Sequence, residues 1–322
     1  MSSIYSKLSL ALLIVLVYSN TILNTFHFDD IPSILEKPWI RGLDKIPEFI
    51  LSFFQRPLVI LSFNLNYSIS GFEVWSYHVF NILFHIIATL LVYKLVQQII
   101  FFLGKHTSKN TSHLFSWPYF SALVFALHPL STQSVTYISS RSSILATIFY
   151  ILSLILFFKG FNERNFNKRS GRISFFGSFL FFLFGVLTKE IIITLPAALF
   201  IFHFYFIWKK SFGSWLSVYG KWVLLLLIPI FAGIGYKQFV GGGFLAASSA
   251  ELSSSTWLLT QTSVVPFEYF RKFLFPFNLN LDIDFPILSF LIPSTPSLFA
   301  AALVASPAGS NTEGRRLTNT FA

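Results

Sequence analysis

The feature that most constrains this chain is a series of long apolar segments separated by short polar or basic runs. Charged residues make up 11% of the 322 positions and hydrophobic residues 54%, whereas a soluble domain carries about 25% charged residues. Several apolar segments approach the length of about 20 residues that a helix needs to cross a bilayer. The sequence therefore predicts an all-α polytopic membrane protein.

Eight or nine membrane segments are expected. They cover residues 8–22, 75–103, 117–130, 144–158, 175–187, 191–208, 222–236 and 285–304, with 257–275 as a broken or re-entrant ninth. The long outer loop at 21–74 contains amphipathic runs such as 46–61, which fit helices lying in the interfacial plane. Residues 1–304 are thus expected to form one membrane domain. Residues 305–322 are small and polar, and predict a disordered or aberrant tail.

The basic residues indicate how the segments are oriented. Residues 159–172 hold the most basic loop of the chain, which the positive-inside rule assigns to the cytoplasm. Counting segments from Lys7, which is expected inside, gives the same orientation. The net charge of +10 therefore reflects membrane orientation, and no nucleic acid partner is expected. The absence of cysteine excludes thiol nucleophiles and thiolate metal sites.

Two adjacent acids, Asp29 and Asp30, follow the first apolar segment directly. A carboxylate at the membrane edge can act as general base for a hydroxyl nucleophile. The alternative is a helix cap, because Asp shortly before Pro is a common helix start. Since there are two acids, one can cap while the other takes part in catalysis. Which of them is the base stays open.

Lys189 is the basic residue that a purely structural interpretation explains least. In the run Thr188-Lys189-Glu190, the threonine can cap the following helix and the glutamate favours its positive end. A lysine at that position is unfavourable, unless an anionic ligand such as a phosphate binds there.

Arg141 and His128 each have two interpretations. Arg141 fits either an interfacial anchor of the next segment or a forked phosphate ligand. His128, which precedes Pro129, fits a hydrogen-bonded structural residue or a substrate-binding group. His78 and His85 lie on one helix face without a third ligand, so no metal site is expected.

Several familiar catalytic and transport patterns are missing from the sequence. It contains no Gly-rich phosphate loop after a strand and no nucleophile elbow. The apolar segments are nearly free of Asp, Glu, Lys and Arg, although proton-coupled transporters and channels need ionisable groups at mid-membrane. The pattern favours chemistry at one membrane face over conduction through the middle.

A set of short motifs occurs in a defined order. They cover residues 28–34, 56–58, 65–67, 77–85, 126–130, 135–141 and 187–190. Their order and spacing, over residues 2–286, resemble the transmembrane-and-tetratricopeptide-repeat O-mannosyltransferase-like proteins and their bacterial relatives. The resemblance implies a C-type glycosyltransferase fold, a multi-helix membrane domain whose first outer loop bears the acid pair.

The resemblance also implies an activity. Such enzymes move a sugar from a polyprenyl-phosphate carrier to a protein Ser/Thr or glycan hydroxyl on the non-cytoplasmic face, with inversion. By similarity, Asp29 or Asp30 would deprotonate or orient the acceptor, and Arg141 and Lys189 would neutralise the departing phosphate. Glu190 would orient Lys189 or the sugar. No cofactor beyond the donor substrate is implied, and a divalent metal requirement stays open.

The chain departs from the family at its C-terminal end. Full-length relatives carry tetratricopeptide repeats with a period of roughly 34 residues, so the sequence is expected to be a bacterial member truncated before its repeats. The expected location is the bacterial cytoplasmic membrane, or the endoplasmic reticulum in a eukaryote. The expected partners are the lipid-linked donor, the acceptor and membrane lipids. The alternative function is a non-enzymatic carrier of lipid-linked sugar or a membrane assembly factor, which needs the basic residues but no base.

Overall fold

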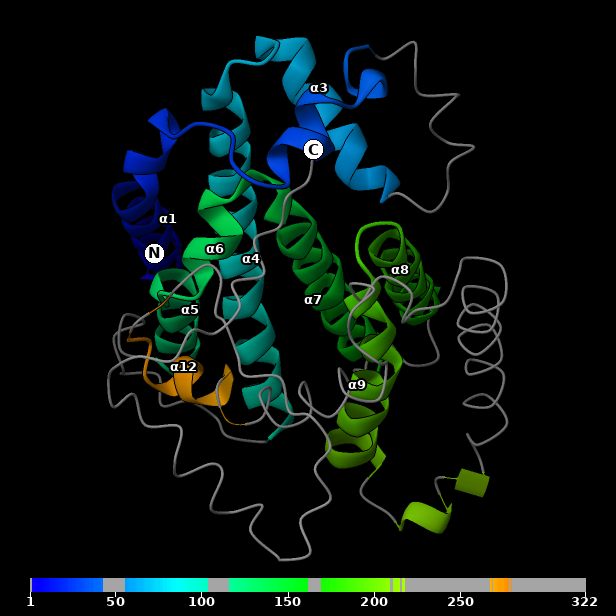
Figure 1. The fold of residues 1–322 in the computed structure, drawn as a ribbon. Coiled ribbons are helices and arrows are strands. Elements are labelled where there is room, and N and C mark those ends of the chain that lie inside the picture. The colour runs from blue at the N-terminus through cyan, green and yellow to red at the C-terminus, as the bar shows by residue number, and fades with distance from the viewer. Residues whose placement is uncertain are drawn as a thin grey trace, which may run out of the picture. The chain divides into compact units, whose positions relative to one another are not determined.

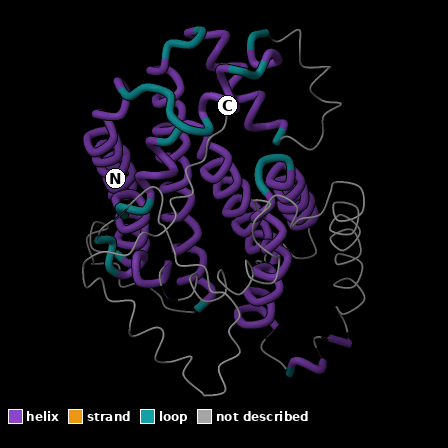
Figure 2. Tube along the Cα trace, viewed as in Figure 1, coloured by secondary structure: helices purple, strands orange, loops and turns teal. Residues whose placement is uncertain are grey.

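In the computed structural model, the regular secondary structure of the described residues is helical (Figure 1). The described residues are 2–42, 56–103, 116–161, 169–208, 211–214, 216–217, 267, 269–277 and 279. Among them no strand occurs (Figure 2), as the composition predicts. The chain divides into two compact units, residues 1–241 and 242–322. The expected boundary at residue 304 and the tail at 305–322 lie outside the described residues.

Three helices in the described part are long and apolar enough to cross a membrane. The first consists of α1 (Ser2–Tyr18) and a 3-10 turn at Ser19–Leu23. The second is α4 (Val74–Phe102). The third joins a 3-10 turn at Ile138–Ser140 to α7 (Arg141–Phe161). They confirm the expected segments 8–22, 75–103 and 144–158, and they identify a membrane protein. The expected segments 222–236 and 285–304 lie outside the described residues.

Two shorter helices agree with the expected segments in part. Helix α5 (Trp117–Leu127) ends where the backbone becomes extended at His128, because Pro129 disfavours a helical conformation at the residue before it. Helix α8 (Arg169–Val186) begins six residues earlier than the expected segment at 175–187. Its first turn is basic and polar, which hydropathy alone does not count as membrane segment.

The expected segment at 191–208 is not one continuous α-helix. It consists of a 3-10 turn at Glu190–Thr194, α9 (Leu195–Phe202) and a π-helical turn at His203–Trp208. Pro196, at the start of α9, has no backbone N–H to continue a helix from the preceding turn. The apolar run therefore predicts the segment but not the change in helix type.

The outer loop contains a full α-helix as well as short turns. Helical turns occur at Ile31–Leu35 and Pro38–Ile40, and α3 covers Pro57–Ser70. Of the amphipathic run expected at 46–61, residues 56–61 lie within the described part, and most of them belong to α3. In the second unit, α12 (Phe270–Leu274) lies within the segment 257–275 that was expected to be broken.

Helix α4 lies at the centre of the first unit. In Figure 1 it runs between α1 and α5 on one side and α7 on the other, and it packs against all three. The short helix α6 (Ser131–Thr136) also contacts α4. The largest core cluster includes Ile14, Phe63, Tyr77, Ile82 and Ile144, which come from α1, α3, α4 and α7. This cluster fixes the ends of four helices where the polar motifs of the sequence lie.

Helices α7 and α8 pack closely through small residues. Ser153 of α7 and Ser178 of α8 are both buried, and each hydroxyl donates to the backbone carbonyl of the other at 2.8–2.9 Å. Small side chains let membrane helices approach closely, and serine hydrogen bonds between such helices contribute about 0.6 kcal/mol each. The contact holds α8, and the Thr188-Lys189-Glu190 run after it, against α7.

Gly185 sets the position of the chain just after α8. A Cβ at this position would lie 2.5 Å from Cγ1 and Cδ1 of Ile192, which is fully buried. The 3-10 turn that begins at Glu190 can therefore pack against α8 only if residue 185 has no side chain.

We expect Gly185→Val to lower the free energy of unfolding by about 1–3 kcal/mol, the usual cost of overpacking a core. The turn at Glu190–Thr194 would have to move to accommodate the new side chain. The matched control is Gly213→Val, because no atom lies within 4 Å of the Cβ position at Gly213. Thermal unfolding of the purified variants measures both effects, and equal shifts in the two variants would contradict this account.

Candidate functional site

Asp30 is the buried member of the acid pair. It is 1% exposed, and its carboxylate accepts three hydrogen bonds. Oδ1 accepts from the backbone N–H and the hydroxyl of Ser139, at 2.7 and 2.5 Å, and Oδ2 accepts from the N–H of His27 at 3.1 Å. Ser139 lies in the first turn of the helix that continues as α7. A carboxylate there is stabilised both by the N–H groups and by the helix dipole.

Asp29 lies at the surface. Its side chain is exposed, and its backbone N–H donates to the hydroxyl of Tyr137 at 2.8 Å. Burial, together with the negative charges of Asp29 and Asp30, raises the pKa of Tyr137 to about 12. Tyr137 is therefore a neutral phenol at physiological pH. The preceding residue, Phe28, has a left-handed backbone with φ 47°, which is uncommon for a non-glycine residue and turns the chain sharply before the acid pair.

The two acids therefore have different surroundings. The expected cap of the following helix is not formed, because Asp30 makes no side-chain cap bond with the turn at Ile31–Leu35. Its carboxylate binds the turn before α7 instead. Asp29 remains accessible to a second molecule.

Arg141 is the most enclosed charged residue among the described residues. Its side chain is 0% exposed. The guanidinium donates to Oδ1 of Asn81 (2.7 Å) and Oδ1 of Asn66 (2.5 Å), to the carbonyl and hydroxyl of Ser62 (both 3.2 Å) and to the carbonyl of Tyr77 (2.9 Å). Its Cζ also lies 4.5 Å from the ring centre of Phe63. All its acceptors are uncharged.

This position differs from both interpretations of Arg141 that the sequence allows. An interfacial anchor or a direct phosphate ligand requires a guanidinium with accessible surface, and this one has none. Its donors are occupied by Ser62 and Asn66 of α3 and by Tyr77 and Asn81 of α4. Arg141 thus fixes the start of α7 against α3 and α4.

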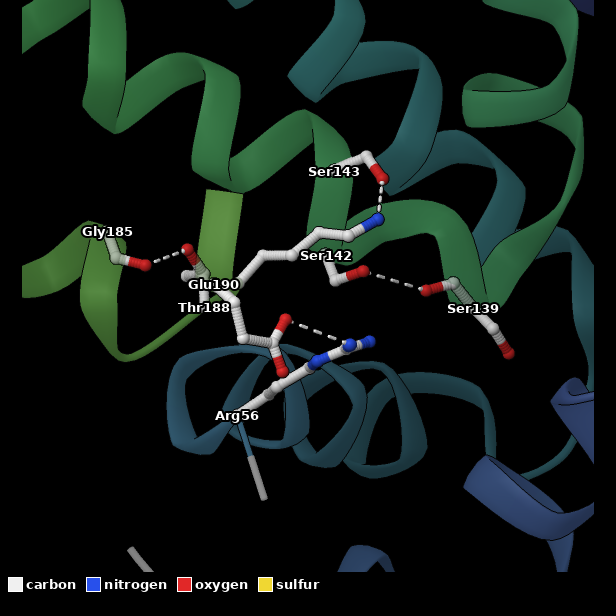
Figure 3. Close-up of polar contacts among 8 residues, drawn as sticks. Arg56, Ser139, Ser142, Ser143, Gly185, Thr188 and Glu190 are labelled. Atoms are coloured by element: carbon white, nitrogen blue, oxygen red, sulfur yellow. Dashed lines mark hydrogen bonds and ion pairs between the residues drawn. The ribbon is translucent and has the colours of Figure 1, made fainter. Parts of the chain in front are cut away.

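Lys189 points back toward α7. Its Nζ donates to the hydroxyl of Ser143 at 2.7 Å (Figure 3). The side chain is half-buried, and this burial lowers the pKa of Lys189 below its ordinary value of 10.5, with a further decrease from Arg56 and an opposing increase from Glu190. Within the described residues, the hydrogen-bond acceptor of its Nζ is thus a neutral hydroxyl.

Glu190 and Thr188 flank this lysine. Glu190 forms an exposed ion pair with Arg56, with 3.3 Å between Oε2 and Nη2 (Figure 3). Arg56 precedes α3 and has a left-handed backbone, with φ 57°. The hydroxyl of Thr188 donates backwards to the carbonyl of Gly185 at 2.6 Å, so it does not cap the following turn. The ion pair links the end of α8 to the start of α3.

His128 has a local structural contact. It is half-buried, and its Nδ1 accepts from the N–H of Leu130 at 3.2 Å. This bond stabilises the turn between α5 and α6, in agreement with the structural interpretation. A substrate-binding role for His128 stays a prediction.

Residues 137–143 connect the acids to the lysine. Tyr137 and Ser139 bind the acid pair at one end, and Ser143 binds Lys189 at the other. Ser142 donates to the carbonyl of Ser139 at 3.4 Å between them (Figure 3). The sequence placed these residues in a motif without giving Tyr137, Ser139 or Ser143 a role. In the sequence, only their closeness to Arg141 indicated that these three residues belong to the site.

The described residues contain no group of three or more His, Cys, Asp or Glu side chains that could hold a metal ion. The described side chains at this site include an exposed carboxylate, a half-buried ammonium and an exposed ion pair. A carboxylate can accept a proton from a hydroxyl, and an ammonium can stabilise an anion.

Comparison with known proteins gives one consistent result. The chain is 26% identical over 301 residues to "Protein O-mannosyl-transferase F38B6.6" of Caenorhabditis elegans, covering 88% of this chain. It is 34% identical over 155 residues to human "Protein O-mannosyl-transferase TMTC2" and 36% identical over 113 residues to human "Protein O-mannosyl-transferase TMTC4". The chain is thus similar to several proteins that are named protein O-mannosyl-transferases. The family resemblance of its motifs is thereby confirmed.

The coverage of these relatives is partial. The chain spans 39% of the length of the nematode protein, and the matches cover 17% of human TMTC2 and 15% of human TMTC4. No family model and no solved structure matches the chain.

We expect Ser139→Ala to destabilise the protein by about 1.5–3 kcal/mol, because the lost bond is made to a buried carboxylate. Ser140→Ala is the matched control, since Ser140 lies in the same turn and the Asp30 carboxylate binds Ser139 instead. Chemical denaturation of both variants in the same detergent measures the difference. Equal stability of the two variants would show that the Asp30–Ser139 contact contributes little.

Proposed function

We propose that this chain is the membrane domain of a glycosyltransferase. It moves a hexosyl group, mannosyl by analogy with the names of its relatives, from a polyprenyl phosphate to a hydroxyl of an acceptor. The observation that carries the proposal is that two residues of opposite charge bind the two ends of one short segment, Asp29 through its backbone N–H and Lys189 through its ammonium. Asp29 and Lys189 contact the two ends of residues 137–143, through Tyr137 and Ser143.

The proposed base is Asp29. Its carboxylate accepts the proton of the acceptor hydroxyl while the oxygen forms a bond to the anomeric carbon. The bond from that carbon to the phosphate oxygen breaks, and its electron pair leaves with the polyprenyl phosphate. This single displacement inverts the configuration of the sugar. Asp30 positions Asp29, because its buried carboxylate fixes the loop to Ser139.

Lys189 supplies charge for the leaving group. Its ammonium, half-buried and held by Ser143, stabilises the phosphate on which negative charge develops. Such preorganised stabilisation is commonly the largest contribution to catalysis. Glu190 orients the lysine through the ion pair with Arg56. Arg141 is a positioning residue in this scheme, because its guanidinium is enclosed by protein acceptors.

The proposed side of the membrane follows from α7. Its first residue is Arg141, beside the site, and Lys159 lies in its last turn. The basic loop that begins there is expected in the cytoplasm, so the site faces the opposite, non-cytoplasmic side. The names of the relatives support a protein as acceptor, and serine and threonine carry suitable hydroxyls.

We expect Asp29→Asn to lower sugar transfer by about 100-fold to 10,000-fold, the usual contribution of a general base. Transfer is measured in membranes from a radiolabelled polyprenyl-phosphate mannose to a serine- and threonine-rich peptide. The melting temperature should stay unchanged, because the Asp29 side chain is exposed.

Asp30→Asn is the matched control for this experiment. It removes the charge of a buried carboxylate that accepts three hydrogen bonds. We expect it to lower the free energy of unfolding by about 2–3 kcal/mol and to lower transfer as well. Full transfer by the Asp29→Asn variant would refute Asp29 as the base. If both variants bind the lipid-linked sugar and neither they nor the wild type transfers it, the chain is a carrier.

We also expect transfer to fall at alkaline pH through loss of the Lys189 charge. The pKa of Lys189 lies below 10.5, so the ammonium is present below that pKa and is lost as the pH rises through it. Arginine stays protonated over this range, so the Lys189→Arg variant should keep its transfer rate to a higher pH. The measurement is the pH profile of transfer between about pH 7 and 10.5, relative to each variant's own maximum.

Lys159→Arg serves as the control in these profiles, since Lys159 lies at the other end of α7. An alkaline decrease that is identical in wild type and the Lys189→Arg variant would assign it to another group.

A further inference from the structure

One face of α8 combines two arginines with exposed apolar side chains. Arg169, Arg172, Ile173 and Phe176 line an open cleft of about 340 Å³. Their spacing of three, four and seven residues places all four on one side of the helix. Ile173 is 60% exposed and Phe176 67% exposed. This arginine–phenylalanine face is separate from the candidate site described above.

The opposite face of α8 is already occupied. Gly171, Ser174 and Ser178 are buried, and Ser178 bonds to Ser153 of α7. The arginine–phenylalanine face is therefore turned away from α7. It continues along the helix with Phe179 and Leu183, which are also exposed, so an apolar strip extends from the arginines toward the other end of α8.

The cleft lies at the end of α8 opposite to the candidate site. Lys189 follows the last residue of α8 closely, whereas Arg169 is its first residue. A helix of this length spans about 27 Å at a rise of 1.5 Å per residue, close to the hydrocarbon thickness of about 30 Å. If the candidate site lies at one membrane boundary, Arg169 and Arg172 lie at the other.

The charges of this face are unbalanced. Both arginine side chains are exposed, and no described residue forms an ion pair with either of them. Neighbouring guanidinium groups one helical turn apart can reach the same anion, and arginine binds phosphate with paired N–H donors. Further along α8 from the arginines, the same face is apolar, with exposed Ile173 and Phe176.

We propose that this face binds an anionic glycerophospholipid. The phosphate and its acidic headgroup lie between Arg169 and Arg172, and an acyl chain lies along Ile173 and Phe176. A lipid is the occupant that has a phosphate and a hydrocarbon chain in this order along the membrane normal. Free phosphate would leave the apolar part of the cleft exposed to its surroundings. This inference does not depend on the proposed transferase activity.

The experiment measures lipid retention by the purified chain. The chain is reconstituted in nanodiscs of phosphatidylcholine with increasing phosphatidylglycerol, extracted with mild detergent, and examined by native mass spectrometry for bound lipid. Wild type should retain phosphatidylglycerol in preference to phosphatidylcholine. The double variant Arg169→Ala/Arg172→Ala should bind phosphatidylglycerol roughly 30-fold more weakly, the factor for two basic contacts at an anionic surface.

Three further measurements make the result specific. The double variant Lys94→Ala/Lys159→Ala also removes two exposed basic residues, one each from α4 and α7, and should keep the preference. Phe176→Ser should weaken retention with both arginines in place. Glycerol phosphate, which has the headgroup chemistry without the acyl chains, should not displace the lipid at equal concentration.

Three outcomes would overturn the proposal. The first is equal retention of phosphatidylglycerol and phosphatidylcholine by wild type. The second is an equal loss in the arginine and lysine double variants, which would assign the effect to surface charge in general. The third is displacement by glycerol phosphate as effective as by lipid, which would identify a site for free anions. Unchanged melting temperatures in the arginine variant establish that it is folded.

Discussion

The buried guanidinium of Arg141 is the interaction on which the rest of the site depends. A charge without exposed surface is costly unless its hydrogen bonds are satisfied, and in a membrane protein such a residue is rarely tolerated without a function. Here Asn66 and Asn81 provide amide oxygens at 2.5 and 2.7 Å, and Phe63 provides an aromatic face. Because these groups come from α3 and α4, the cation can be buried only when both helices are in place around the start of α7.

The positions of the candidate functional groups follow from this anchor. Ser139 lies two residues before Arg141 and Ser143 two residues after it, on the same helix start. One holds the buried carboxylate of Asp30 and the other holds the ammonium of Lys189. The distance between these two contacts is therefore determined by helix geometry, at about 1.5–2.0 Å of rise per residue, rather than by flexible loops. Sites supported by regular elements are held more precisely than sites on loops.

The sequence predicted the membrane segments at 8–22, 75–103 and 144–158 because hydropathy reports directly on single helices. It also favoured chemistry at one membrane face, and Asp29 and Lys189 both contact one short segment, residues 137–143. It could not tell Asp29 from Asp30, two identical side chains side by side. Which one becomes buried depends on the contact with Ser139, more than 100 residues away, and such contacts leave no periodic signal.

The two ends of α8 show why charge counts alone did not assign roles. Lys189, after one end, is half-buried and bound to Ser143, whereas Arg169 and Arg172, at the other end, are exposed. The sequence singled out Lys189 by its place before a helix, but it gave Arg169 and Arg172 no role beyond the basic loop at 159–172. A charge that must stabilise a particular atom needs a fixed position, which burial and close packing such as that of Gly185 against Ile192 provide. A charge that meets a fluid lipid surface needs only to be accessible. The difference between these two kinds of site is a difference in packing, and it becomes visible only when the neighbours from other helices are known.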